Sequence, residues 1–280
     1  MFSLKHTFES AQPLTFYADY NEISNTLTYP YSGLMINLMH SGSDEKGTLH
    51  IVSGRGNIAK SEVRRRFRLE DDMQKIYKRI NTDDHIAKAI ESYKGMRLTL
   101  NDKWETTLVF IISQFNNVKR IRLITRNIVQ KFGRDVHDSA GRVVAKSFPQ
   151  STDLMNGTEK EFASLGAGFR AKYIKKAAEF CTHNINLGKL PAHKYGKLKA
   201  ELMQIDGVGD KVADCIALMG YGNLEAFPID VHIKRTVEKI YFRGKKKSLK
   251  EIQEFAEKRW SGYQGYAQQY LFHNARINRA

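Results

Sequence analysis

The chain has 280 residues, with 45 Lys and Arg against 30 Asp and Glu, a formal net charge of +15 and two cysteines. This excess of positive charge favours a polyanionic partner, either nucleic acid or an acidic membrane surface, although a basic protein without such a partner is an alternative. Cys181 and Cys215 are too few for a disulfide framework or for a four-cysteine iron–sulfur or zinc site, and both are expected to pack as small apolar residues.

The first residues, "MFSLKHTFESAQ", lack the apolar core of a signal peptide, and no run of about 18 apolar residues could span a membrane. We therefore expect a soluble intracellular protein with no membrane partner, in the cytoplasm or nucleoid or, in a eukaryote, in the nucleus. Nucleic acid becomes the favoured polyanion.

The N-terminal part alternates between apolar and polar residues, which is typical of half-buried strands. Four strands are predicted by the segments "LTFYADY" (14–20), "LTYPY" (27–31), "LMINLMH" (34–40) and "GTLHIVSG" (47–54). From about residue 72 onward the apolar period changes to about 3.6, which favours helices. Helices are predicted over 72–80, 84–95, 103–115, 119–133, 169–185, 193–205, 210–222, 230–242, 249–260 and 265–276.

These patterns predict an α+β fold in two parts. A small N-terminal antiparallel β-sheet domain, residues 1–80, precedes a larger all-helical domain, residues 81–280. No long apolar seam or exposed pairing strand is evident in the sequence, so we expect a monomer.

The segment "LKAELMQIDGVGDKVADCIALM" fits two helices packed across a very short turn, a hairpin over 198–218. Gly207 and Gly209 give the turn backbone freedom and leave no side chain over the amides. Bare amides at a helix start, together with the helix dipole, bind an anion such as a DNA phosphate. This helix-hairpin-helix pattern predicts binding to a DNA backbone without sequence preference.

Lys211 lies in the first turn of the second hairpin helix, where a cation is electrostatically disfavoured. The same field favours the neutral amine, which is a nucleophile suited to covalent catalysis. A simple phosphate contact is the alternative interpretation.

Asp230 follows Pro228 and precedes "VHIKRTVEKIYF", so it is expected to cap the next helix. Capping alone is a sufficient reason for an acid there. A carboxylate facing an amine nucleophile also suits cleavage of a glycosidic bond, because the transition state resembles an oxocarbenium ion.

The stretch "IDGVGDKVADCIALMGYGNLEAFPIDVHIKR" resembles the hairpin, loop and aspartate signature of base-excision DNA glycosylases of the HhH-GPD superfamily. "DKVADCIALM" with "PIDVH" most resembles the 8-oxoguanine DNA glycosylases. The resemblance implies a bifunctional enzyme that excises the oxidised purine from duplex DNA and acts as a lyase at the abasic site. Lys211 would be the nucleophile and Asp230 would stabilise the cationic transition state. The chain lacks the four C-terminal cysteines of the iron–sulfur endonuclease III branch.

Residues 95–133 resemble the helix pair that ends in the family's asparagine-rich strand-separating loop. The resemblance implies that Asn116 belongs to this loop and that Arg120 hydrogen-bonds to the cytosine left unpaired when the damaged base is flipped out. Phe115 occupies the position of the inserted asparagine. It is expected to act as a hydrophobic wedge in the vacated stack, or else as a core aromatic that ends its helix.

Three further DNA contacts follow from the resemblance. "LGAGFRAKYI" is similar to a family segment in which Phe169 would be a wedge beside the unpaired base and Arg170 a second donor to it. Packing and phosphate contact are the alternatives for this pair. His232 matches a phosphate-contacting histidine, although a lone helix histidine is often structural.

The segment "GYAQQYLFHNAR" resembles the family's base-recognition helix. It implies that Gln268 bonds to the Watson–Crick edge of the flipped base and that Phe272 stacks on its face. The two residues are four apart and share a helix face. Ala11 stands where relatives carry a glycine whose carbonyl senses the proton on N7 of 8-oxoguanine.

The reaction implies no metal and no organic cofactor, although hairpins of this family can hold a monovalent cation with backbone carbonyls. Two alternatives stay open. One is an alkylated-base DNA glycosylase of the same fold, which the altered "AQPLTFY" and "SQFNN" segments favour and Lys211 disfavours. The other is a non-catalytic helix-hairpin-helix DNA-binding protein.

Overall fold

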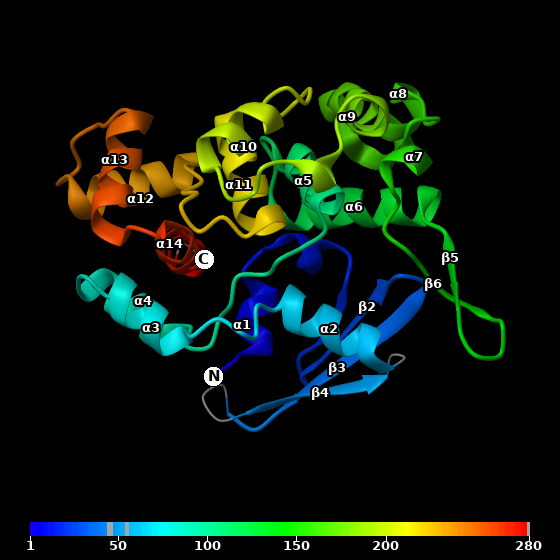
Figure 1. Ribbon diagram of the computed structural model, residues 1–280, viewed down its shortest axis with the longest axis horizontal. Coiled ribbons are helices and arrows are strands. Elements are labelled where there is room, and N and C mark those ends of the chain that lie inside the picture. The colour runs from blue at the N-terminus through cyan, green and yellow to red at the C-terminus, as the bar shows by residue number, and fades with distance from the viewer. Residues whose placement is uncertain (44–46, 54–55, 279–280) are drawn as a thin grey trace.

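The computed structural model describes residues 1–43, 47–53 and 56–278. A small antiparallel sheet lies beneath a larger helical body, as Figure 1 shows. The predicted α+β fold is confirmed by this arrangement.

The sheet has the order β1-β2-β3-β4 and every pair is antiparallel. Its strands are β1 (Asp19–Asn21), β2 (Thr26–Tyr31), β3 (Leu34–Ser41) and β4 (Thr48–Ser53). Leu27 faces Leu38, and Tyr29 faces Ile36, so alternate residues of β2 and β3 enter one core. Helix α2 (Gly56–Arg66) supplies Ala59 and Val63 to the same core.

The strand predicted over 14–20 is wrong for most of its length. The chain instead forms α1 (Leu4–Glu9), whose cap is the Ser3 hydroxyl, and a short 3₁₀ helix η1 (Pro13–Phe16) that begins at a proline. Of the predicted strand, only the last two residues, Asp19 and Tyr20, enter β1. The predictions for β2, β3 and β4 are confirmed, except that Gly54 lies outside the described residues.

The ten predicted helices are all present, with ends that shift by a few residues. They are α3 (Met73–Ile80), α4 (Asp84–Ser92), α5 (Lys103–Ser113), α6 (Val118–Phe132), α9 (Ala171–His183), α10 (Tyr195–Leu202), α11 (Asp210–Tyr221), α12 (Val231–Tyr241), α13 (Leu249–Trp260) and α14 (Gln264–Ile277). Besides α1 and α2, the prediction omitted a β-hairpin and several short turns of helix. These are β5 (Asp135–His137), β6 (Val143–Lys146), α7 (Ser151–Leu154), α8 (Glu159–Phe162), η2 (Ala163–Ala167), η3 (Gly168–Arg170) and η4 (Leu187–Lys189).

Two apolar clusters form the interior. The smaller one lies between the sheet, α1 and α2, and the larger one fills the helical body, where α11 packs along α5. Met73, Ile76 and Ile80 of α3 belong to the larger cluster, and α3 packs on α14. The division of the chain at residue 80 stays a prediction.

A buried ionic network joins the two parts. The Arg66 guanidinium pairs with Glu62 within α2 and lies 3.2 Å from a carboxylate oxygen of Glu105 on α5. The Tyr17 hydroxyl donates to Glu105 at 3.0 Å. Burial raises the pKa of Glu105, while Arg66 opposes that rise. The network therefore fixes the position of α5 relative to the sheet. Helix α5 also forms one wall of the cavity described below.

Among the helices that the described residues form, none combines the length and the apolar character needed to cross a bilayer.

Candidate active site

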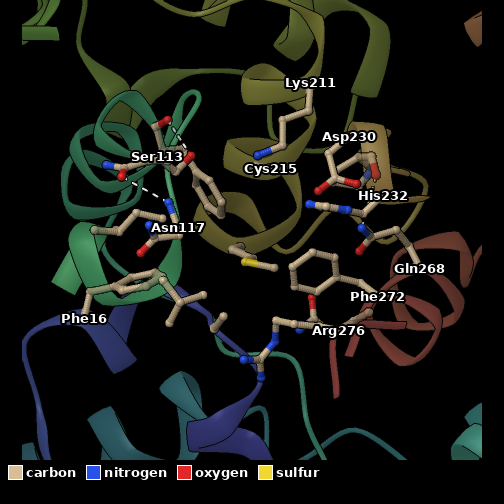
Figure 2. Close-up of a pocket in the computed structure, with 18 residues that line it drawn as sticks. Phe16, Ser113, Asn117, Lys211, Cys215, Asp230, His232, Gln268, Phe272 and Arg276 are labelled. Carbon is tan, nitrogen blue, oxygen red and sulfur yellow. Dashed lines mark hydrogen bonds between the residues drawn. The ribbon is translucent and has the colours of Figure 1, made fainter. Parts of the chain in front are cut away.

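A cavity of about 290 Å³ opens between the N-terminal segment, α5, the start of α6, α11 and α14. This is close to the lower end of small-molecule sites, about 300 Å³. Its lining combines apolar and aromatic side chains with polar and charged ones, among them Lys211, Asp230 and Gln268, as Figure 2 shows. A pocket with this lining suits a flat ring, because apolar groups can pack on the ring faces and polar groups can hydrogen-bond to the atoms at its edge.

Lys211 is the second residue of α11, which begins after the extended residue Gly209. Its side chain lines the cavity, and Nζ lies 5.1 Å from the centre of the Phe110 ring. In Figure 2 the side chains of Lys211 and Asp230 point toward the same space. The packing of α11 on α5 therefore presents an amine at the wall of an apolar pocket.

Asp230 caps α12, as expected from sequence. Its Oδ1 accepts a hydrogen bond from the Ile233 amide at 2.7 Å, and the carboxylate also lines the cavity. The cap fixes the side-chain rotamer, so the acid is held on the Lys211 side of the pocket. His232, which is exposed, lines the same mouth.

Cys215 lies one turn after Lys211 on α11 and lines the cavity. Burial raises the pKa of its thiol to about 11, against the opposing effect of Lys211. At neutral pH it is therefore a thiol and an apolar wall residue. Cys181 is half-buried and lies on α9, and burial raises its pKa to about 12.

Helix α14 presents Gln268 and Phe272 to the cavity beside the segment that carries Asp230. The Gln268 amide donates from Nε2 to the Pro228 carbonyl at 3.1 Å. Its Oε1 is buried and accepts no hydrogen bond from any described residue. A buried acceptor without a donor is costly, so this atom suits the N–H of a bound ligand.

Ala11 also lines the cavity and has a φ of 58°, a left-handed conformation that alanine rarely adopts. The next residue, Gln12, is fully buried and holds this turn. Its Nε2 donates to the Arg97 carbonyl at 2.8 Å, and its Oε1 accepts from the Thr99 amide at 2.7 Å. The Ala11 turn is therefore set by contacts with residues far along the chain.

The two expected wedge residues lie on the surface. Phe115 is 94% exposed and Phe169 is 51% exposed, with ring centres 6.2 Å apart. Phe115 is therefore not the core aromatic of the alternative interpretation. Asn116 lies beside it, bonded from Nδ2 to the Ile112 carbonyl at 3.1 Å.

The two arginines expected to read the unpaired base differ in their surroundings. Arg120 is exposed, and its Nη2 lies 3.4 Å from the Gly166 carbonyl. Arg170 is 3% exposed, and its guanidinium is directed at backbone carbonyls of the protein. Burial lowers its pKa, with a smaller contribution from Arg120.

The hairpin turn between α10 and α11 contains both predicted glycines. Gly207 has a φ of 84°, and a Cβ there would lie 2.9 Å from the Tyr173 ring. Only glycine meets both conditions. Gly209 is the extended residue before α11, and it makes no side-chain cap, so no side chain at this position covers the start of the helix.

Sequence reasoning missed several wall residues. These are Phe16, Phe110, Ser113, Met219, Gln269 and Arg276. Arg276 follows Gln268 and Phe272 at a spacing of four, so helical periodicity could have placed it on the same face. Nothing local in the sequence marks the others.

Comparison with known proteins fits this geometry. Residues 108–262 match the HhH-GPD superfamily of base excision DNA repair proteins, which is more than half of the chain. The chain therefore belongs to that superfamily. Residues 1–107 match the N-terminal domain of 8-oxoguanine DNA glycosylases.

Individual relatives agree with this assignment. The N-glycosylase/DNA lyase of Saccharomyces cerevisiae is 28% identical over 253 residues, covering 78% of this chain and 67% of the relative. The Clostridium acetobutylicum 8-oxoguanine glycosylase/lyase, bound to double-stranded DNA with cytosine opposite 8-oxoguanine, matches with a TM-score of 0.89 at 29% identity. MBOgg1 in complex with a low-affinity DNA ligand matches with the same TM-score at 32% identity. Each of these two structures covers 100% of this chain, which covers 93% of theirs.

Proposed function

We propose that this chain is a bifunctional DNA glycosylase and abasic-site lyase that excises 8-oxoguanine from duplex DNA. The observation that carries the proposal is that one cavity is lined by Lys211, by Asp230 and, next to Asp230, by Gln268 and Phe272. An amine, an acid, a base-edge acceptor and an aromatic face are the groups that this reaction needs. The names of the relatives support the same activity.

In the first step the Lys211 amine attacks C1′ of the damaged nucleotide, and the bond from C1′ to the base nitrogen breaks. The base leaves with the bonding electron pair and takes up a proton. Asp230 stabilises the positive charge that develops on the sugar.

In the second step the sugar ring opens and the nitrogen of Lys211 forms a protonated Schiff base with C1′. Loss of a proton from C2′ then expels the 3′ phosphate by β-elimination. Water releases the enzyme from the remaining sugar.

Recognition of the base falls to α14 and the N-terminal segment. The unpartnered Oε1 of Gln268 accepts from an N–H on the Watson–Crick edge, and Phe272 stacks on the ring. The carbonyl of Ala11 is the acceptor for the proton on N7, which 8-oxoguanine carries and guanine lacks. Phe115 and Phe169 fill the gap in the duplex.

The duplex is held by its phosphates. The amides at the start of α11, where Gly209 carries no side chain, bind one phosphate, and His232 contacts another. We further propose that the enzyme is a monomer, uses no metal or organic cofactor and acts inside the cell, where its DNA substrate lies.

The experiment is borohydride trapping on an end-labelled duplex with one 8-oxoguanine opposite cytosine. Native protein and Lys211→Gln are compared on a denaturing gel, with Lys197→Gln, at an exposed lysine of α10, as the control for loss of a lysine. We expect a covalent adduct with the native protein and with Lys197→Gln, and none with Lys211→Gln.

Two other outcomes would favour the alternatives. Base release without an adduct from duplexes carrying 3-methyladenine, but not 8-oxoguanine, would indicate an alkylated-base glycosylase. Binding without base release or trapping on either lesion would leave a helix-hairpin-helix DNA-binding protein.

A further inference from the structure

The Arg170 guanidinium is bonded to backbone carbonyls of the protein, whereas a residue that recognises a base needs donors that are free to bind the base. We infer that Arg170 is a positioning residue that holds the turn carrying Phe115, so that the aromatic wedge is already projected before DNA binds. Reading of the base opposite the lesion then rests on Arg120. This inference rests on the proposed function, because it assigns the work of base extrusion within it.

The guanidinium of Arg170 is committed to the end of α5. Its Nε donates to the Gln114 carbonyl at 2.7 Å, and its Nη2 donates to the same oxygen and, at 2.9 Å, to the Phe115 carbonyl. Its Nη1 donates to the Ala167 carbonyl at 3.2 Å. The carbonyls at a helix C-terminus carry partial negative charge, so a buried cation is well placed there.

The turn that these bonds hold is one that phenylalanine does not favour. Phe115 has a φ of 47°, in the left-handed region. Because its side chain is 94% exposed, packing of the ring supplies little support for this conformation. The backbone conformation must therefore be stabilised by other contacts. The Arg170 guanidinium provides them, because it binds the carbonyls of both Gln114 and Phe115.

Neighbouring contacts complete the support. The Gln114 side chain donates from Nε2 to the Gly207 carbonyl at 3.0 Å, which ties the turn to the hairpin. Asn117 caps α6 by accepting from the Arg120 amide at 3.0 Å. The Arg170 guanidinium also lies 4.4 Å from the centre of the Phe169 ring, so one side chain contacts both wedge residues.

Arg120 is suited to the other role. It is exposed, and the hydrogen bond from its Nη2 to the Gly166 carbonyl is long, at 3.4 Å. Its guanidinium can leave this contact at little cost and bind two acceptors on a base edge. For Arg170 to do so, the carbonyls of Gln114 and Phe115 would lose their buried partner.

The first experiment compares Arg170→Met, Arg170→Lys and Arg120→Met in single-turnover assays. Substrates are 8-oxoguanine opposite cytosine, 8-oxoguanine opposite adenine, and a preformed abasic site opposite cytosine. Loss of positioning should slow base excision by roughly tenfold to a hundredfold in Arg170→Met, by the same factor opposite cytosine and adenine. Cleavage at the abasic site, where no base is extracted, should change much less.

Arg170→Lys keeps the positive charge on a single donor nitrogen but loses the planar fork, so it should restore part of the excision rate. Arg120→Met should instead lower the ratio of the cytosine rate to the adenine rate. Circular dichroism checks that each variant is folded, and Arg170→Lys carries the comparison if Arg170→Met is not.

The second experiment needs no catalysis. A duplex carries a tetrahydrofuran abasic analogue beside 2-aminopurine, whose fluorescence reports on stacking next to the gap. Native protein should change the fluorescence at saturation, Phe115→Ala should abolish that change, and Arg170→Met should reduce it strongly although DNA still binds.

The inference is overturned if Arg170→Met alters the cytosine-to-adenine ratio as Arg120→Met does, because Arg170 would then read the base. A native fluorescence change and native excision in Arg170→Met would overturn it too. If the native protein neither excises nor cleaves, the proposed function fails, and the fluorescence comparison still decides whether Arg170 holds the wedge.

Discussion

Gln269 donates from Nε2 to the carbonyl of Ser10 at 2.8 Å, which joins α14 directly to the turn that carries Ala11. One hydrogen bond thus connects the two parts of the pocket that are farthest apart in the chain. The wall of the pocket that carries Gln268 and the turn that carries Ala11 are therefore held in one frame.

The left-handed conformation of Ala11 predicts the effect of restoring a glycine. Ala11→Gly should raise the free energy of unfolding by up to about 1 kcal/mol, since a left-handed L-residue costs about 1–2 kcal/mol and glycine loses about 0.5–1 kcal/mol more entropy on folding. Urea unfolding measures the change. Ala87→Gly, within α4, is the control and should lower stability by about 1 kcal/mol. A loss of stability in Ala11→Gly would mean that the turn is not strained.

Asp230→Asn separates capping from chemistry. Asparagine caps a helix about as well as aspartate, so stability should change by less than about 0.5 kcal/mol, whereas excision should fall by roughly a hundredfold or more because the charge is lost. Thermal unfolding and single-turnover excision measure the two effects. Asp230→Ala should lose the cap as well, at a cost of about 1 kcal/mol. Near-native excision by the asparagine variant would remove Asp230 from the mechanism.

The unpartnered Oε1 of Gln268 predicts a recognition defect. Gln268→Met keeps the volume and removes the acceptor, so excision of 8-oxoguanine should fall by about tenfold to a hundredfold, equivalent to about 1–3 kcal/mol. Gln264→Met is a matched control, because Gln264 is buried on the same helix with an unpartnered Oε1 but does not line the cavity. Equal losses in the two variants would show a general effect on α14.

His273 predicts how stability depends on pH. Burial, with Arg276 and then His6, lowers the pKa of this fully buried imidazole from 6.5 to about 3. Between these values the unfolded chain binds a proton that the folded chain does not, so stability falls as the pH drops from about 6.5 toward 3. The slope from this group is at most about 1.4 kcal/mol per pH unit.

Urea unfolding of native protein and His273→Gln at pH 7.5, 6 and 5 should show a smaller pH dependence in the variant. His193→Gln, at an exposed histidine, serves as the control and should behave as the native protein does. Parallel pH curves for native protein and His273→Gln would contradict the assignment.

Much of the fold was predictable from local pattern. The helices α5 and α6 begin at the side-chain caps Asp102 and Asn117, and α11 ends at the left-handed Gly222, so their positions follow from nearby residues. The region over 4–16 was not predictable in this way. The backbone of Ser3 donates to the Gly95 carbonyl, and Gln12 bonds to Arg97 and Thr99, so its conformation depends on residues more than eighty positions away.

In the candidate site, too, some features follow from local sequence and others depend on distant contacts. Lys211, Asp230 and Gln268 were found through motifs, because their spacing along helices and turns is local. The orientation of Arg170 was not, since its partners are carbonyls of a turn 55 and 56 residues earlier. A residue type in a motif indicates which chemistry is available, whereas the direction of its side chain is decided by distant backbone.

The pocket wall formed by α14 has a consequence for a chain emerging from the ribosome. Lys211 and Asp230 are synthesised before Gln268, Phe272 and Gln269, so a nascent chain contains the lysine and the acid of the pocket before the α14 wall and its bond to Ser10 can form. An incomplete chain also leaves the apolar faces of α3 and α4 without the helix that covers them. Helix α14 follows the other pocket elements in the chain, so its packing completes both the pocket wall and the cover over α3 and α4.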